Sequence, residues 1–483
     1  LRRRLALATG RPNEAIQQQP LLEAVLPDDG SRRNSRRELL LGLRTAFGSG
    51  IRLEPQTAAR DPTVRGWLEL GILAAQAARG ARIAPALASW QSRFPAHPAA
   101  DIAASELLAN GGPAQPTAAP GAHVAVVLPL SGRAAAQAAQ IREGLLTAWY
   151  ASPGHDRPEL RFYDSASTPI ADLLRTANES GADFIIGPLL REEVLAAAEV
   201  FGARPPTLAL NFLPAEHPAP ADFYQFALSP EDEARQIARR ALADGRRRAV
   251  VLVPAGDWGQ RVLAAFVNEM NAAGGTVLAS ATYSPSAADH SAAITTLLRI
   301  SDSRARARRI EAIIGSSVNL QPRRRGDIDF IFAGGPASAA RQLRPQLRFH
   351  YAGDIPTYAT SDSFEPSVSA NQDLEGLIFA DMPWVLTNDT IVEQVRAALR
   401  GAWGEDGAVR SKLFAFGYDA WLLATELRAG RGASLNQRAG LTGKLTVDPT
   451  GRVRRELEWA QIRAGAPRLL GPPAPSAAAA PGR

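Results

Sequence analysis

The chain has 483 residues, 46% of them hydrophobic and 21% charged, which is typical of a globular protein with two or three domains. It contains no cysteine, which excludes disulfides, thiolate metal ligands and cysteine nucleophiles within the chain. The formal net charge of +6 could indicate an anionic partner, but acidic residues are interleaved with the basic ones, and we expect no nucleic-acid binding.

Residues 1–110 are predicted to be helical, because strand signals are absent from them. Residues 35–45 begin with a good N-cap candidate, and residues 64–78 place Trp67 and Leu70 on one apolar stripe. A third short helix is predicted at residues 83–90. These helices suit either antiparallel pairs of the tetratricopeptide kind or a small bundle. Residues 111–122 follow as a linker rich in proline and glycine.

The first β–α unit is predicted at residues 123–150. An apolar run from Val124 to Leu130 ends in a Ser131-Gly132 turn, and a helical pattern follows. A strand, a tight turn and a helix begin an open parallel sheet. Because ligands of such sheets bind at the carboxyl ends of strands, the Ser131-Gly132 turn lies where a binding crevice would open.

The alternation of predicted strands and helices continues to residue 462. A first set of strands is predicted at 160–164, 183–189, 207–211 and 223–228, before a helix with Ser229 as N-cap and Pro230 at its first position. A second set is predicted at 248–254, 276–283, 329–333, 356–360 and 377–379. A hairpin at 441–462 and a disordered tail at 471–483 end the chain. We expect the strands after Pro356 to return to the first set. The predicted fold is therefore an α/β two-lobed domain over residues 123–470, with a cleft between its lobes, preceded by an all-α domain.

Polar and aromatic residues at strand ends are the candidate binding residues. We expect them to face the interlobe cleft, where a small ligand would need convergent polar groups and an aromatic platform. They are Ser131, Gly132, Gly187, Asn211, Asp257 and Trp258. Trp258 and Tyr283 could supply the platform, or each could belong to the core of its lobe.

The motifs of catalysis are not found. The six histidines have no metal-ligand spacing and none lies beside a serine elbow, and no phosphate-binding glycine loop occurs. We expect no catalytic residue, no metal and no cofactor. The densest charge forms a basic element that either faces a partner or is a solvated helix face. Its residues are Arg304, Arg308, Arg323, Arg324 and Arg325.

Long sequence segments, taken in order along the chain, resemble segments of the penicillin-binding protein activator lipoproteins of Gram-negative bacteria, the LppC family. They include VAVVLPLSGR at 124–133, GADFIIGPLLREEV at 181–194, VVLVPAGDWGQRVLAAF at 250–266 and LFAFGYDAWLLA at 413–424. The resemblance covers 123–465 and implies a type I periplasmic-binding-protein-like fold. GWLELGILA at 66–74 and WQSRFPAHPA at 90–99 resemble the family's tetratricopeptide-like domain.

The resemblance implies a non-enzymatic role in cell-wall synthesis. Members activate a bifunctional peptidoglycan synthase, a penicillin-binding protein, by direct contact. They face the periplasm and are held in the outer membrane by a lipidated cysteine, which we expect upstream of Leu1. We expect a monomer. The alternative is a periplasmic solute-binding receptor that uses the interlobe cleft. Relatives that bind amino acids have hydroxyl-bearing residues in a loop that reads Pro188-Leu189-Leu190-Arg191 here, which argues against the alternative.

Overall fold

The computed structural model describes residues 2–8, 11–48, 61–78, 83–103, 123–152, 157–200, 204–214, 216–316, 322–366, 369–404, 410–432 and 435–472. The predicted linker 111–122 lies outside these residues, as does the predicted tail 471–483 except for its first two residues. The chain divides into two units. Unit 1 comprises Leu1–Ala227, Glu393–Leu441 and Leu445–Arg454, and unit 2 comprises Leu228–Val392, Thr442–Lys444 and Arg455–Arg483.

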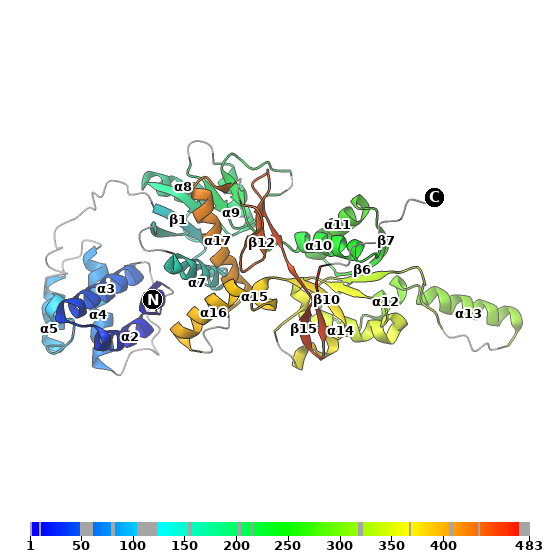
Figure 1. Cartoon of the computed structure of the whole chain (residues 1–483), viewed down its shortest axis with the longest axis horizontal. Helices are drawn as coiled ribbons and strands as arrows, with labels where there is room; N and C mark the ends of the chain where they lie inside the picture. The colour runs from blue at the N-terminus through cyan, green and yellow to red at the C-terminus, as the bar shows by residue number, and fades with distance from the viewer. Residues whose placement is uncertain are drawn as a thin grey trace. The chain divides into compact units, whose positions relative to one another are not determined.

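The N-terminal part of unit 1 is helical (Figure 1). Its described helices include α1 (Arg2–Ala8), α2 (Pro12–Val25), α3 (Asp29–Gly48), α4 (Pro62–Ala78) and α5 (Ala84–Arg93). Trp67 and Leu70, on the predicted stripe, are buried in α4, and Trp90 of α5 is buried with them. This helical region has its own hydrophobic core, whose buried side chains all lie between Ala6 and Ala103.

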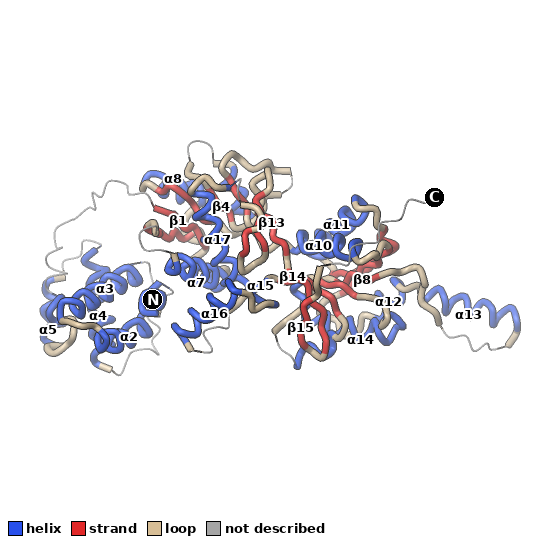
Figure 2. Tube along the Cα trace, in the orientation of Figure 1, coloured by secondary structure: helices blue, strands red, loops and turns tan. Residues whose placement is uncertain are grey.

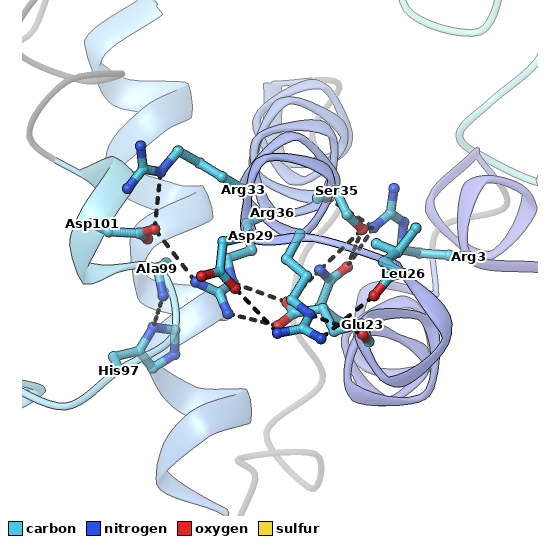
Figure 3. Close-up of polar contacts among 12 residues, drawn as sticks. Arg3, Glu23, Leu26, Asp29, Arg33, Ser35, Arg36, His97, Ala99 and Asp101 are labelled. Carbon is cyan, nitrogen blue, oxygen red and sulfur yellow. Dashed lines mark hydrogen bonds and ion pairs between the residues drawn. The ribbon is translucent and has the colours of Figure 1, made fainter.

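Arginine side chains connect the helices of this region (Figure 3). Buried Arg3 of α1 donates hydrogen bonds to Gln19 of α2, to Ser35 Oγ of α3 at 2.7 Å and to Glu38 Oε2 at 2.8 Å. Arg36 likewise donates to Glu23 Oε2 of α2 at 2.7 Å. Burial acts to raise the pKa of Glu23, but the bonds from Arg36 and Gln19 outweigh it and leave the pKa below its usual value.

The first sheet of unit 1 has five parallel strands in the order β2-β1-β3-β4-β5. These are β1 (His123–Leu128), β2 (Glu159–Asp164), β3 (Ala182–Ile186), β4 (Thr207–Ala209) and β5 (Phe223–Gln225). The helices along it are α7 (Ala135–Ala151), α8 (Ile170–Glu179) and α9 (Arg191–Ala198). Every residue of β1 is buried, as expected for a central strand of a parallel sheet covered on both faces.

Unit 2 repeats this strand order in a larger sheet, β15-β14-β10-β9-β8-β6-β7. Its strands β8, β14 and β15 are labelled in Figure 2, which draws strands in red. Its strands are β6 (Arg248–Pro254), β7 (Thr276–Tyr283), β8 (Phe330–Ala333), β9 (Thr357–Ala359), β10 (Leu377–Asp381), β14 (Glu458–Arg463) and β15 (Ala466–Leu469). The strands from β7 to β10 are parallel, and β14 and β15 are antiparallel additions at one edge. The parallel part therefore has the order β7-β6-β8-β9-β10, which matches β2-β1-β3-β4-β5 of unit 1 strand for strand.

The helices of unit 2 connect its strands. They are α10 (Pro230–Ala243), α11 (Asp257–Ala272), α12 (Ser291–Leu297), α13 (Ile300–Ile314), α14 (Ala337–Leu347) and α15 (Pro383–Leu386), with short helical turns η3 (Arg348–Ala352), η4 (Ser361–Ser363) and η5 (Ser369–Leu374). The predicted start of α10 is confirmed, because Ser229 Oγ accepts a hydrogen bond from the Asp232 backbone N–H at 3.2 Å.

The prediction that strands after Pro356 return to the first set is wrong. β9 pairs in parallel with β8 and β10, so both later strands belong to the sheet of unit 2. An apolar run reveals that a strand is buried but not which strand lies beside it, and this is why the sequence did not settle the pairing. Instead, the chain re-enters unit 1 within α16 (Thr390–Trp403), continues into α17 (Lys412–Arg428), and α17 packs against α7.

The last strands depart from the predicted hairpin. β12 (Lys444–Val447) and β13 (Val453–Glu456) pair around a turn in which the Gly451 N–H donates to Asp448 O at 2.9 Å. They form a small sheet with β11 (Arg438–Ala439). The predicted second hairpin strand is broken after Glu456, and β14 pairs with β10 instead.

Candidate functional site

The parallel part of each sheet has a topological switch point, where successive connections leave in opposite directions and ligands of such folds bind. In unit 1 it lies between β1 and β3, and in unit 2 between β6 and β8. The sequence-predicted binding residues follow these strands. Ser131 and Gly132 follow β1, Gly187 follows β3, and Asp257 follows β6.

The side chain of Ser131 is bound within unit 1. Ser131 Oγ donates to Asp164 Oδ2 at 2.7 Å, and the backbone N–H groups of Leu130 and Ala166 donate to Asp164 Oδ1 at 2.8 and 3.1 Å. Asp164, the last residue of β2, therefore fixes the turn after β1. Burial acts to raise the pKa of Asp164, but these hydrogen bonds outweigh it and the pKa lies below its usual value.

Replacing Asp164 with alanine is expected to destabilise the turn by about 2 kcal/mol, because part-buried N–H groups lose their acceptor. Hydrogen exchange at residues 128–132 should accelerate accordingly. Since folding lowers the pKa of Asp164, its stabilisation is present above the unfolded pKa of about 3.9 and is lost as the pH falls through the folded value. The loss of stability at acidic pH that comes from protonation of Asp164 should be absent from the alanine variant.

Asp172→Ala is the control for this prediction. Asp172 is a more exposed aspartate of unit 1 that pairs with Arg175 on the surface of α8, so its loss should cost about 0.5 kcal/mol and leave exchange at residues 128–132 unchanged. Equal protection of the turn in the Asp164→Ala protein would contradict the role given to Asp164.

Gly187 and Asn211 also serve the local structure. Gly187 has a φ of 106°, and a Cβ there would lie 2.0 Å from Val127 O. Asn211 Nδ2 donates to Leu189 O at 3.1 Å, and Asn211 Oδ1 accepts from the Phe212 N–H at 3.0 Å. The polar groups that follow β3 and β4 are thus largely engaged with neighbouring backbone.

In unit 2, aromatic side chains gather at the switch point. Tyr283 is buried, and its hydroxyl donates to Gly334 O at 2.9 Å, just after β8. Burial raises the pKa of the Tyr283 hydroxyl above its usual value. Trp258 is half-buried and packs against the core of unit 2, whereas Asp257 is exposed at the start of α11.

The predicted residues therefore fall into two groups, one in each unit. Ser131, Gly132, Gly187 and Asn211 lie at the carboxyl edge of the first sheet, and Asp257 and Trp258 lie at that of the second. The interlobe cleft itself stays a prediction. Asp164 was not among the predicted site residues. An aspartate that ends a strand beside a serine turn was the available signal, but only the pairing of β1 with β2 brings them together.

The predicted basic element divides into bound and exposed arginines. Arg324 pairs with Asp354 at 2.6 Å and Arg325 with Asp327 at 2.6 Å. The Arg325 guanidinium lowers the pKa of Asp327 to about 2. Arg304, Arg308 and Arg323 are exposed.

Among the residues described, no group of three or more histidine, cysteine, aspartate or glutamate side chains is placed to hold a metal ion. Within the same parts of the chain, no helix combines the length and apolarity needed to cross a bilayer.

Comparison with known proteins gives consistent matches. The family described as "LppC putative lipoprotein" matches residues 43–465. A Photobacterium profundum protein named penicillin-binding protein activator LpoA is 28% identical over 471 residues, 95% of this chain and 74% of that protein.

Solved structures resemble the part of the chain that contains the two sheets. The C-domain of LpoA from Haemophilus influenzae, described as a regulator of PBP1A, has a TM-score of 0.56 and 22% identity, covering 72% of this chain and 100% of that one. An ABC transporter substrate-binding protein from Sphaerobacter thermophilus has a TM-score of 0.51 and 18% identity, covering 72% and 96%. The predicted fold class is confirmed as a type I periplasmic-binding-protein-like α/β fold with an N-terminal helical region.

Proposed function

Because the chain belongs to the LppC lipoprotein family, we propose that it activates a bifunctional peptidoglycan synthase, a penicillin-binding protein, by direct contact. The observation that carries this proposal is the 28% identity to the Photobacterium activator, which extends over 95% of the chain. The similarity therefore includes the helical region as well as both α/β units.

The proposed role is binding without bond chemistry. An activator of this kind stabilises the competent state of its partner by binding that state more tightly. The bonds of Ser131 to Asp164 and of Asn211 to Leu189 support this choice, since these strand-end groups are engaged within the protein. A solute receptor would instead need them to point at a ligand.

We further propose that the protein acts in the periplasm as a monomer, tethered to the outer membrane by a lipid anchor outside this chain. The lipoprotein description of the family supports the tether. An anchored activator must reach its synthase through the peptidoglycan, so the helical region would extend its reach.

The test uses the organism's bifunctional penicillin-binding proteins. We expect the purified chain to retain one of them in a pull-down and to increase its rate of glycan polymerisation. If no synthase binds and none is stimulated, the proposal fails. Thermal shifts with amino acids and cell-wall fragments provide the counter-test, because a clear stabilisation by a small ligand would favour a solute receptor.

A further inference from the structure

A short turn after α14 presents aromatic side chains to solvent. Phe349 is 77% exposed and Tyr351 is 55% exposed, and both belong to η3, which is a kinked turn because the backbone of His350 and Tyr351 is not helical. His350 between them points inward, where its Nε2 lies 3.0 Å from Ser291 Oγ. The inward histidine fixes the turn on α12, so the two aromatic side chains beside it are held outward. Exposed aromatic side chains held in this way are typical of binding surfaces rather than of a core.

The backbone of this turn is held in an uncommon conformation. Tyr351 has a φ of 63° and a ψ of 22°, in the left-handed region that bulky residues rarely adopt. Arg324 secures it, because Arg324 Nε donates to Tyr351 O at 2.6 Å while its guanidinium also pairs with Asp354 at 2.6 Å. Backbone strain of this kind occurs frequently at functional sites.

Three exposed arginines lie around the same turn: Arg304, Arg323 and Arg348. The Arg323 N–H donates to Ser303 Oγ at 3.0 Å, which places Arg323 beside the first turn of α13. Burial lowers the pKa of His350, the nearby charge of Arg304 lowers it further, and the carboxylate of Asp289 acts in the opposite direction.

The charges of Arg304, Arg323 and Arg348 have no acidic partner in the part of the chain that the structure describes. Among the described residues, none of the three arginines has a carboxylate at ion-pair distance. The nearby carboxylate of Asp354 forms its ion pair with Arg324 instead. We call the surface formed by Arg304, Arg323, Arg348, Phe349 and Tyr351 the aromatic–arginine patch. It is positive in charge and contains two fixed aromatic side chains.

We propose that the aromatic–arginine patch docks an acidic surface of the peptidoglycan synthase, an inference that rests on the proposed function. Tyrosine and arginine are enriched among the residues that dominate protein–protein binding, and unpaired positive charge selects an acidic partner. A polyanion such as a glycan strand or an anionic bilayer would use the charges but would not require aromatic side chains fixed by a strained turn.

The test compares variants of the full chain for affinity to the immobilised synthase and for stimulation of glycan polymerisation. Phe349→Ala combined with Tyr351→Gly should weaken binding at least tenfold. Because glycine adopts a left-handed backbone without strain, the melting temperature of this variant should not fall, which separates docking from folding. Arg304→Glu combined with Arg323→Glu should also weaken binding, and the remaining affinity should depend less on salt.

Arg468→Glu combined with Leu469→Ala is the matched control, since both residues are exposed on the edge strand β15 of the same unit, and its binding should equal that of the wild type. If both patch variants bind and stimulate as the wild type does, the docking inference is wrong and the proposed function stands. If the wild-type chain binds no synthase, the proposed function fails and the inference with it. If the patch variants lose binding to isolated sacculi or to phosphatidylglycerol vesicles but keep the synthase, the patch serves a polyanion and the inference is overturned.

Discussion

Replacing Gly144 with alanine will lower the free energy of unfolding of unit 1 by about 3 kcal/mol, the upper part of the range for overpacking. Gly144 lies in α7, where a Cβ atom would come within 1.9 Å of Phe414 O in α17. Gly417 of α17 is the reciprocal case, because its Cβ would lie 1.9 Å from Ile141 O. The two helices are therefore in backbone contact, and a methyl group at either position forces them apart.

The matched control is Gly401→Ala in α16, where a Cβ would meet nothing within 4 Å. Alanine is the better helix former by about 1 kcal/mol, so this variant should be at least as stable as the wild type. Chemical denaturation followed by circular dichroism, with hydrogen exchange to assign the loss to unit 1, measures both. A Gly144→Ala protein as stable as the Gly401→Ala protein would show that α7 and α17 do not need this close contact.

This helix contact illustrates what the sequence could not provide. The helix that became α7 was predicted from its pattern, and both α7 and α17 contain a glycine, but glycine inside a helix indicates only a weak helix former or a packing site. The partner of Gly144 lies more than two hundred residues later, and no local pattern pairs them. The same limit explains the error about the strands after Pro356, which were predicted as strands but were assigned to the wrong sheet.

The positions of the strand-end residues were predicted more successfully than their contacts with a ligand. Parallel β–α units put Ser131, Gly187 and Asn211 at one edge of a sheet, as the rhythm of the sequence indicated. Whether a hydroxyl at such an edge meets a ligand depends on its neighbours. Here Asp164 of the adjacent strand binds the Ser131 hydroxyl, a contact set by strand pairing. Partner-facing surfaces were predicted from charge alone, and the exposed aromatic residues of η3 were missed because an apolar residue in a sequence usually indicates the core.

Replacing Trp90 with alanine will destabilise the helical region by about 4 kcal/mol, within the range for deleting a fully buried tryptophan. Trp90 is 0% exposed, and its indole N–H donates to Gly66 O at 2.9 Å. Trp90→Phe keeps an aromatic ring but loses this bond, so it should cost less than half as much. Hydrogen exchange of residues 62–93, compared with residues 123–151, measures the effect, because the helical region has a core of its own. Equal loss of protection in both segments would contradict that independence.

Trp90 also helps to bury His97, since the two ring centroids lie 5.1 Å apart, and Trp67 packs on the same histidine ring at 5.3 Å. Burial lowers the pKa of His97, and its Nδ1 accepts the Ala99 N–H at 3.1 Å, which requires the neutral ring. Because the folded pKa is below the unfolded value of about 6.5, the helical region should be most stable above that pH and lose stability as the pH falls through the folded value. In Trp90→Phe, which admits water beside the ring, the pKa of His97 should move upward toward its usual value and this pH dependence should shrink. An NMR titration of the His97 ring protons in both proteins measures the shift, and an unchanged pKa would show that burial by Trp90 is not its cause.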